Sequence, residues 1–208
     1  MKRICIVGPS GTGKTDLAKY IASRYRIPFI SSSSKCITKE KGINSHKELI
    51  HLCSNKPQEA LSTYKAILNY REGIMDDNSS FVTDRGIPDL IVYAHLQLVP
   101  HIDDKDSLLL LQQSIDIITD QEVHYIFLPY ANIPIENDSH RITSMMYQSF
   151  VSSCFDLVIK KFIPDNNLTI INVWDWEARV KIIDNIFKPK SELEKWQNAI
   201  IKFLKRNQ

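Results

Sequence analysis

The sequence predicts an α/β fold of three layers, with helices on both faces of a parallel sheet of about five strands. Three observations support this prediction. The 208 residues are enough for one substantial domain. Short β-branched apolar runs, typical of buried parallel strands, alternate with longer amphipathic helical patterns. A glycine-rich turn at residues 8–15 joins the first such run to the first such helix.

That turn matches the phosphate-binding loop G-x-x-x-x-G-K-S/T at every fixed position, because it runs Gly8-Pro9-Ser10-Gly11-Thr12-Gly13-Lys14-Thr15. Residues 3–7 are a predicted strand and residues 16–22 a predicted helix. The motif therefore has the context of strand, loop and helix that it requires, and we expect a P-loop NTPase fold.

The chemistry of this loop predicts what it binds. Its glycines allow successive backbone N–H groups to point inward, and the helix that follows adds the positive end of its dipole. Lys14 is expected to reach the β- and γ-phosphates, and the Thr15 hydroxyl to ligate Mg²⁺. We therefore expect ATP and Mg²⁺ as cofactors. The residues expected to bind ATP in the loop are Gly8, Ser10, Gly11, Thr12, Gly13, Lys14 and Thr15.

Composition excludes several classes of protein. The net charge of +2 gives no polybasic field, so nucleic-acid binding needs a local argument. The four cysteines are scattered, which indicates neither a zinc site nor a disulfide framework. No signal peptide is apparent, and no apolar run approaches the roughly 18 residues of a membrane span. We expect a cytoplasmic protein without a membrane partner.

Apolar runs between turn signals predict the other strands, and apolar residues three and four apart predict the helices. Ser45 with Glu48 forms a capping box, and Pro57 suits the first turn of a helix. The expected strands lie at residues 26–30, 80–84, 123–128 and 168–173. The expected helices lie at residues 45–53, 57–75, 89–96, 105–119, after 140, and at 177–187.

A second polar site is expected where the strand at residues 80–84 ends in Asp84-Arg85, because open parallel sheets bind ligands at the carboxyl ends of their strands. Asp84 can hold Mg²⁺, together with Thr15, or accept a proton from an attacking hydroxyl. Arg85 can form a bidentate fork with a phosphate. Asp89 is either functional or an early-turn acid that suits the helix dipole.

Weaker candidates flank these two anchors, each with a structural alternative that stays open. Residues 31–34 are serines that either contact the substrate or form a solvated loop. The flexible basic excursion expected at residues 35–44 carries Lys35, Lys39 and Lys41. On the helix at residues 57–75, either Lys65 or Arg71 can face the substrate.

The strand-to-helix loop near residue 174 can cradle the adenine, with Trp174 or Arg179 stacking on it. We expect core packing for both Trp174 and Trp176. Arg179 is accordingly a candidate cofactor-binding residue.

We expect residues 1–187 to form the P-loop domain, with a mobile lid at about residues 129–148, because the exit from the strand at 123–128 is too polar to pack. The helix after the lid would place Arg141, Met145 and Gln148 on one face. In that arrangement Arg141 reaches the γ-phosphate while Met145 packs.

Residues 188–208 are expected to form an amphipathic helix that docks on the domain or on a partner. A homodimer stays open.

With both anchors in place, the chain resembles the P-loop kinases of nucleosides and nucleotides over residues 3–187. The segment Val82-Thr83-Asp84-Arg85-Gly86, with Asp89 and Tyr93-Ala94, resembles the Asp-Arg segment of thymidylate kinases and related deoxynucleoside and deoxynucleoside monophosphate kinases. Thymidylate kinases have an aromatic residue where Gly86 stands. Residues 133–141 with Gln148 are similar to the lid entry of small phage and bacterial kinases near the nicotinamide riboside kinase group.

The resemblance implies that Arg85 grips a phosphate of the acceptor and that Arg141 contacts the transferring phosphoryl group. The catalytic residues it implies, together with the loop, are Lys14, Asp84, Arg85 and Arg141. We therefore expect ATP-dependent phosphoryl transfer to a nucleoside monophosphate or nucleoside. One alternative is a kinase that acts on nucleic acid, at a strand end or on a modified base. Another is an ATPase or nucleotide-dependent switch that phosphorylates no acceptor.

Overall fold

The computed structural model describes residues 2–131 and 144–187. The chain forms two compact units, Met1–Asn172 and Val173–Gln208. Arg141, most of the predicted lid and the predicted C-terminal helix at 188–208 lie outside the described residues. None of the helices in the described part combines the length and the apolar character that a membrane crossing requires.

The first unit is built on a parallel sheet with the order β2-β1-β3-β4. Cys5 of β1 pairs with Thr83 of β2 on one side and with Tyr125 of β3 on the other. Strand β1 is almost entirely buried, as its β-branched sequence predicts for a central parallel strand. The four strands are β1 (Arg3–Val7), β2 (Phe81–Thr83), β3 (His124–Phe127) and β4 (Leu168–Ile170).

The fifth strand expected at residues 26–30 is reduced to a single bridge between Phe29 and Val82, at the outer edge of β2. Two backbone hydrogen bonds hold it: Val82 N donates to Pro28 O at 2.9 Å, and Ile30 N donates to Val82 O at 3.0 Å. Pro28 has no N–H to donate, so the ladder stays short and lies at the edge. The described sheet therefore has four strands where the sequence predicts about five.

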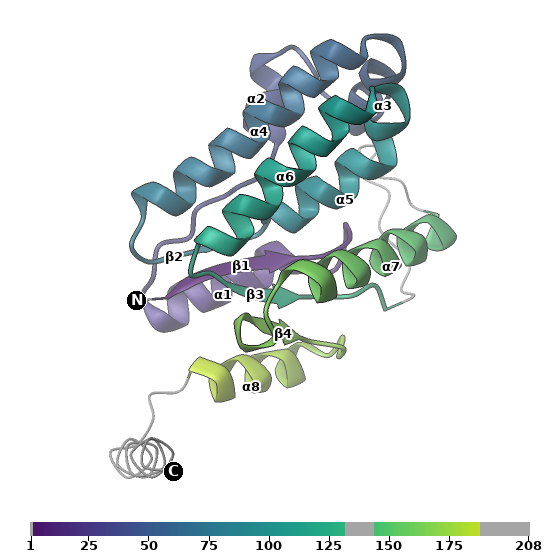
Figure 1. Cartoon of the computed structure of the whole chain (residues 1–208). Coiled ribbons are helices and arrows are strands. Elements are labelled where there is room, and N and C mark those ends of the chain that lie inside the picture. The colour runs from purple at the N-terminus through teal and green to yellow at the C-terminus, as the bar shows by residue number, and fades with distance from the viewer. Residues whose placement is uncertain (1, 132–143, 188–208) are drawn as a thin grey trace, which may run out of the picture. The chain divides into compact units, whose positions relative to one another are not determined.

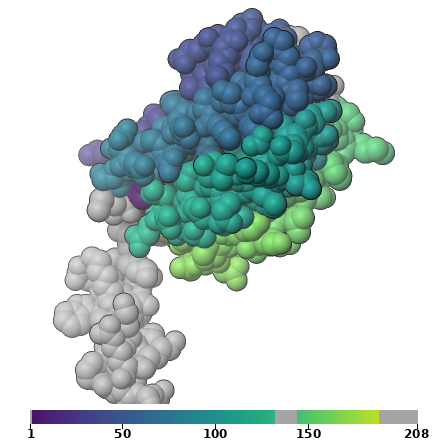
Figure 2. All heavy atoms as spheres, turned by 45° about the horizontal axis from the view of Figure 1, so that its top comes forward, coloured from purple at the N-terminus to yellow at the C-terminus, as the bar shows by residue number. Residues whose placement is uncertain are grey.

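Helices cover both faces of this sheet, which gives the predicted three layers. Figure 1 shows α1 on one face and α4, α5 and α6 on the other, and α7 packs against α5. Figure 2 shows the atoms of α4 (blue) and α6 (teal) packed side by side on the face that it presents. The helices of this unit are α1 (Lys14–Tyr25), α2 (Lys35–Glu40), α3 (His46–Asn55), α4 (Pro57–Asp77), α5 (Ile87–Gln97), α6 (Asp104–Asp120) and α7 (Met145–Phe162), with 3₁₀ turns at Val99–His101 and Asp165–Asn167.

Several predicted helix starts are confirmed. The Ser45 hydroxyl accepts a hydrogen bond from Glu48 N at 3.2 Å at the start of α3, and Pro57 occupies the first turn of α4. The flexible excursion predicted at residues 35–44 is wrong in its first part, because α2 forms there. Its Thr38 is buried and its Ile37 packs against the core, so tertiary contacts rather than local pattern order this segment.

The second unit contains α8 (Trp176–Phe187). Asp175 caps this helix by accepting from Ala178 N at 2.8 Å, and the Arg179 guanidinium lies 4.8 Å from the centre of the Trp174 ring. The core packing expected for the tryptophans is wrong, since Trp174 is 41% exposed and Trp176 43% exposed. A cation–π contact accounts for the position of Trp174.

Candidate active site

The phosphate-binding loop adopts backbone conformations that a residue with a side chain would disfavour. Gly8 has φ 141° and Gly13, the N-cap of α1, has φ 79°. A Cβ added at Gly8 would clash with the carbonyl oxygen of Leu128, because the end of β3 packs directly against the loop. Left-handed dihedrals and a close backbone approach both require glycine here. The loop therefore takes the conformation in which N–H groups can converge on an anion.

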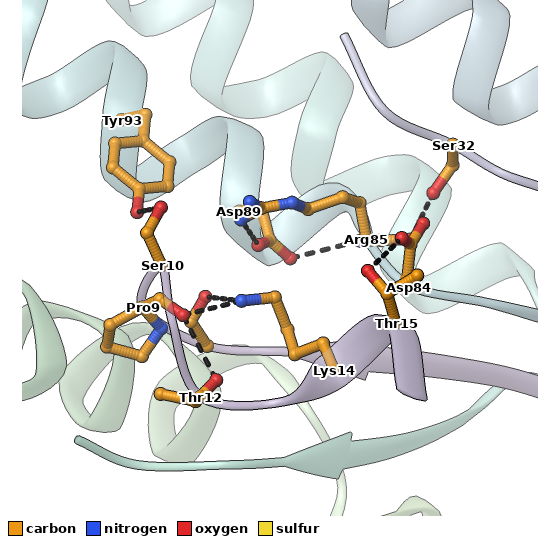
Figure 3. Close-up of polar contacts among 12 residues, drawn as sticks. Pro9, Ser10, Thr12, Lys14, Thr15, Ser32, Asp84, Arg85, Asp89 and Tyr93 are labelled. Carbon is orange, nitrogen blue, oxygen red and sulfur yellow. Dashed lines mark hydrogen bonds and ion pairs between the residues drawn. The ribbon is translucent and has the colours of Figure 1, made fainter. Parts of the chain in front are cut away.

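Lys14 lies across this loop and is buried. Its Nζ donates to Gly8 O at 2.8 Å and to Pro9 O at 2.5 Å, and the Thr12 hydroxyl donates to the same Pro9 carbonyl at 3.0 Å (Figure 3). The side chain thus holds an ammonium charge against the loop whose backbone forms the anion site. Nucleotide phosphates offer stronger acceptors than these carbonyls, because a phosphate oxygen carries negative charge that attracts the ammonium group.

Asp84 meets the first helix turn at the carboxyl edge of the sheet. The Thr15 hydroxyl donates to Asp84 Oδ2 at 2.7 Å (Figure 3). Asp84 Oδ1 is buried and has no hydrogen-bond partner within the described part of the chain. This contact forms because β2 and β1 are parallel neighbours that end at the same edge.

A hydroxyl and a carboxylate are the oxygen ligands that Mg²⁺ prefers. Residues 2–131 and 144–187 bring together no cluster of three or more His, Cys, Asp and Glu side chains that could hold a metal. The Thr15–Asp84 pair therefore fits Mg²⁺ only in the manner of nucleotide enzymes, where one or two side chains share the ion with phosphates and water.

Arg85 forms an ion pair with Asp89, one turn into α5. Arg85 Nη1 lies 2.9 Å from Asp89 Oδ1, and Asp89 Oδ2 accepts from Gly86 N at 3.0 Å. Burial lowers the pKa of Arg85, but the Asp89 carboxylate opposes this effect, and the net result is a pKa above the ordinary value. Asp89 therefore both caps α5 and fixes the position of Arg85.

Arg71 ties three segments together from within α4. It is buried, and it donates from Nε to Ser32 O at 3.3 Å and from Nη1 to Gly86 O at 2.7 Å. The Ser32 hydroxyl in turn donates to Arg85 O at 2.7 Å and hydrogen-bonds the Thr83 hydroxyl. Burial lowers the pKa of Arg71, although the nearby Asp89 opposes the shift.

A cavity of about 790 Å³ opens beside these side chains. It shares a wall with the phosphate-binding loop at Ser10 and Thr15. Its other walls come from the serines at residues 31–34 and from helices α2, α3, α4, α5 and α7. Its volume is typical of small-molecule sites. The candidate residues that line it are Ser31, Ser33, Ser34, Lys35, Lys39, Arg71, Asp84, Arg85, Asp89 and Gln148.

Sequence reasoning assigned no site role to a second group of polar side chains on the cavity wall. The Tyr64 hydroxyl donates to Gln97 Oε1 at 3.0 Å, and Gln97 Nε2 lies 3.1 Å from His46 Nε2. The His46 and Tyr93 rings meet edge to face, 6.0 Å apart at 81°. Both Tyr93 and Gln97 line the cavity with Asp89. Their spacing of i, i+4 and i+8 on α5 is the sequence signal that places them on one face.

Residues 3–179 match the protein family described as an AAA domain (AAA_28). The chain belongs to this family. Among curated proteins, a 73-residue stretch is 36% identical to ABC transporter G family member 23 of Arabidopsis thaliana. That match covers 33% of this AAA domain chain and 12% of the transporter.

The AAA domain is similar in structure to solved kinases. Deoxyadenosine kinase from M. mycoides with bound dATP has a TM-score of 0.64 at 12% identity, covering 91% of this chain and 100% of that chain. Shikimate kinase from Acinetobacter baumannii in complex with shikimate has a TM-score of 0.60 at 14% identity, covering 91% and 96%. Thymidylate kinase from Candida albicans has a TM-score of 0.55 at 18% identity, covering 90% and 92%. The AAA domain thus has the fold of the P-loop nucleoside and nucleotide kinases, as its motifs predict.

The AAA domain brings most of the predicted site together at one edge of the sheet. Lys65 is not among the cavity-lining residues, whereas Arg71 is. Met145, expected to pack, is 46% exposed at the start of α7. Arg179 belongs to the second unit, where its Nε donates to Val173 O at 2.7 Å. The site residues that gather around the loop and the Asp84 edge are Gly8, Ser10, Gly11, Thr12, Gly13, Lys14, Thr15, Asp84 and Arg85.

Close packing against β1 explains why residue 86 is a glycine. A Cβ added there would lie 2.9 Å from Val7 Cγ1 and 3.3 Å from the Cβ of Cys5. The start of α5 therefore approaches β1 too closely for the aromatic residue that thymidylate kinases carry at this point.

Proposed function

We propose that this AAA domain is an ATP- and Mg²⁺-dependent kinase that transfers the γ-phosphoryl group to a nucleoside or nucleoside monophosphate. One observation carries the proposal: a cavity sized for a small molecule shares Ser10, Thr15 and Asp84 with the phosphate-binding site. A nucleotide-dependent switch needs no such second cavity. The likeness in fold to deoxyadenosine, shikimate and thymidylate kinases supports the same reaction class.

In this proposal the donor half of the site is the loop with Lys14 and Thr15. Lys14 neutralises phosphate charge, and Thr15 with Asp84 holds Mg²⁺, which neutralises the phosphates and orients them. Arg85 contacts the acceptor, and for Arg141, which lies outside the described residues, we propose a contact with the transferring phosphoryl group. Catalysis then consists of positioning and charge stabilisation, because phosphoryl transfer leaves the protein little covalent chemistry.

The acceptor half suits a molecule with a flat polar ring. Gln97 lies eight residues beyond Asp89 on α5, about 12 Å at 1.5 Å per residue. The Tyr93 and His46 rings and the Gln97 amide line the cavity along this length. Aromatic rings stack on the faces of heterocycles, and amide groups form hydrogen bonds with the polar edges of heterocycles. A nucleoside, with its base near Gln97 and its sugar near Asp84, spans such a cavity.

The nucleic-acid alternative has weaker support. The exposed Lys35 and Lys39 on α2 line the cavity and could meet a backbone phosphate. The volume of about 790 Å³ matches one nucleoside better than a strand.

The test is transfer of ³²P from γ-labelled ATP to a panel of nucleosides, nucleoside monophosphates and oligonucleotides. The proposal expects label in a mononucleotide product. Label confined to an oligonucleotide, with binding that weakens steeply with salt, would support a nucleic-acid kinase instead. Release of labelled phosphate without transfer to any acceptor would support a switch or ATPase.

A further inference from the structure

The inner wall of the cavity carries balanced charge. We use this name for the part of the cavity that is lined by two carboxylates, Asp84 and Asp89, and two guanidinium groups, Arg71 and Arg85. Asp89 neutralises Arg85 at 2.9 Å and is itself 1% exposed. Arg71 directs Nε and Nη1 to two backbone carbonyls. These four side chains therefore offer no net positive charge to a ligand.

A nucleoside monophosphate would bring a phosphate of about two negative charges to this wall. Burying such a group is costly unless a cation is free to pair with it. Within the described part of the chain, the other lysine and arginine side chains that line the cavity are the exposed Lys35 and Lys39 of α2. Exposed lysines contribute little because solvent screens them. The inner wall thus disfavours an anionic acceptor.

The hydrogen-bonding capacity of Asp84 also favours an uncharged acceptor over an anionic one. Its Oδ1 is buried beside the cavity without a hydrogen-bond partner in the described residues, so a bound donor or a cation would satisfy it. An acceptor hydroxyl can donate a hydrogen bond to such an oxygen. A phosphate dianion has none to donate, and its charge would repel the carboxylate.

We propose that the acceptor presents an uncharged hydroxyl, so the substrate is a nucleoside rather than a nucleoside monophosphate. This inference rests on the proposed kinase function. The acceptor oxygen attacks the γ-phosphorus of ATP, and the new O–P bond forms as the bond to the bridging oxygen of ADP breaks. ADP leaves with that electron pair. The hydroxyl proton passes to an oxygen of the transferred phosphoryl group and then to water.

The deciding experiment supplies γ-labelled ATP with matched pairs, each nucleoside beside its own 5′-monophosphate, at equal concentrations. The inference expects labelled monophosphate from at least one nucleoside and at least a hundredfold slower formation of labelled diphosphate from its partner. Diphosphate formed as fast as monophosphate, or faster, would overturn the inference while leaving the kinase function intact. No labelled acceptor from either member of any pair would overturn the kinase function and the inference with it.

A variant tests the charge argument separately. Asp89→Asn keeps the shape of the side chain but leaves the positive charge of Arg85 without the Asp89 carboxylate that neutralises it. The monophosphate should then inhibit nucleoside phosphorylation at least tenfold more strongly than it inhibits the unmodified protein, with folding checked by circular dichroism. If the monophosphate already inhibits the unmodified protein at the KM of the nucleoside, the charge argument is wrong.

Discussion

Thr15 and Asp84, 69 residues apart in the chain, meet through a hydrogen bond of 2.7 Å. The contact joins the first turn of α1 to the end of β2. It places the hydroxyl and the carboxylate of the proposed Mg²⁺ site side by side, where the phosphate-binding loop and the cavity share a wall.

Thr15→Val removes the hydroxyl and keeps the branched shape. We expect the Mg²⁺ concentration for half-maximal transfer to rise at least tenfold, about 1.4 kcal/mol, because one oxygen ligand is lost. Excess EDTA should abolish transfer by the unmodified protein. Thr119→Val is a matched control, since that hydroxyl bonds only carbonyls of its own helix in the described structure. An unchanged Mg²⁺ titration for Thr15→Val would contradict this assignment.

Gly8→Ala should damage both the loop and stability. The positive φ and the clash with the Leu128 carbonyl predict a loss of about 2–4 kcal/mol in the free energy of unfolding, with loss of ATP binding. Gly73→Ala lies inside α4 with open space around the added methyl, and we expect it to gain about 0.5–1 kcal/mol. Urea unfolding measures both, and equal effects would refute the geometric argument.

Arg85→Ala should affect the acceptor more than the donor. The substitution leaves Asp89 buried without its cation beside the cavity, so we expect acceptor KM to rise or kcat to fall by at least tenfold. ATP affinity should change less than about threefold. Steady-state kinetics with each substrate varied, and ATP binding by calorimetry, separate the two. A loss mainly in ATP affinity would move Arg85 to the donor half.

Stability should fall in mild acid. Burial lowers the pKa of His46, helped by the charge of Arg85, and burial lowers the pKa of His124. Below about pH 6.5 the unfolded chain therefore binds protons that the folded chain resists. The stabilisation is present above that pH and is lost as pH falls through the folded pKa values.

The measurement is Tm between pH 8 and 5. His46→Gln should reduce the acid-side fall, whereas the exposed His95→Gln should follow the unmodified protein. Identical pH dependence for His46→Gln and the unmodified protein would show that His46 is not responsible.

Local sequence determined the parts of the fold that depend on local physics. The apolar run of β1, the glycine loop and the capping residue Ser45 were predictable because each effect acts within a few residues. Helix α2 was not, since it is stabilised by burial of Thr38 rather than by periodicity. The edge strand shrank to one bridge at Phe29 because of a neighbouring proline.

The candidate site likewise contains residues that the sequence predicts and residues that it does not. Lys14, Thr15 and Asp84 were predictable from motif and topology, because parallel neighbours end at one edge. The chain Tyr64–Gln97–His46 was not, because it joins three helices whose contacts no spacing reveals. The exposure of Trp174 was not predicted either, although its cation–π partner Arg179 lies nearby in the sequence.

The central claim is transfer from a nucleotide held by the phosphate-binding loop. The most direct measurement compares acceptor-dependent ³²P transfer by the unmodified protein, by Lys14→Ala and by Lys19→Ala, an exposed lysine on the same helix. We predict transfer by the unmodified protein and by Lys19→Ala, and at least a hundredfold loss with Lys14→Ala. Transfer at the same rate in the Lys14→Ala protein would contradict the account.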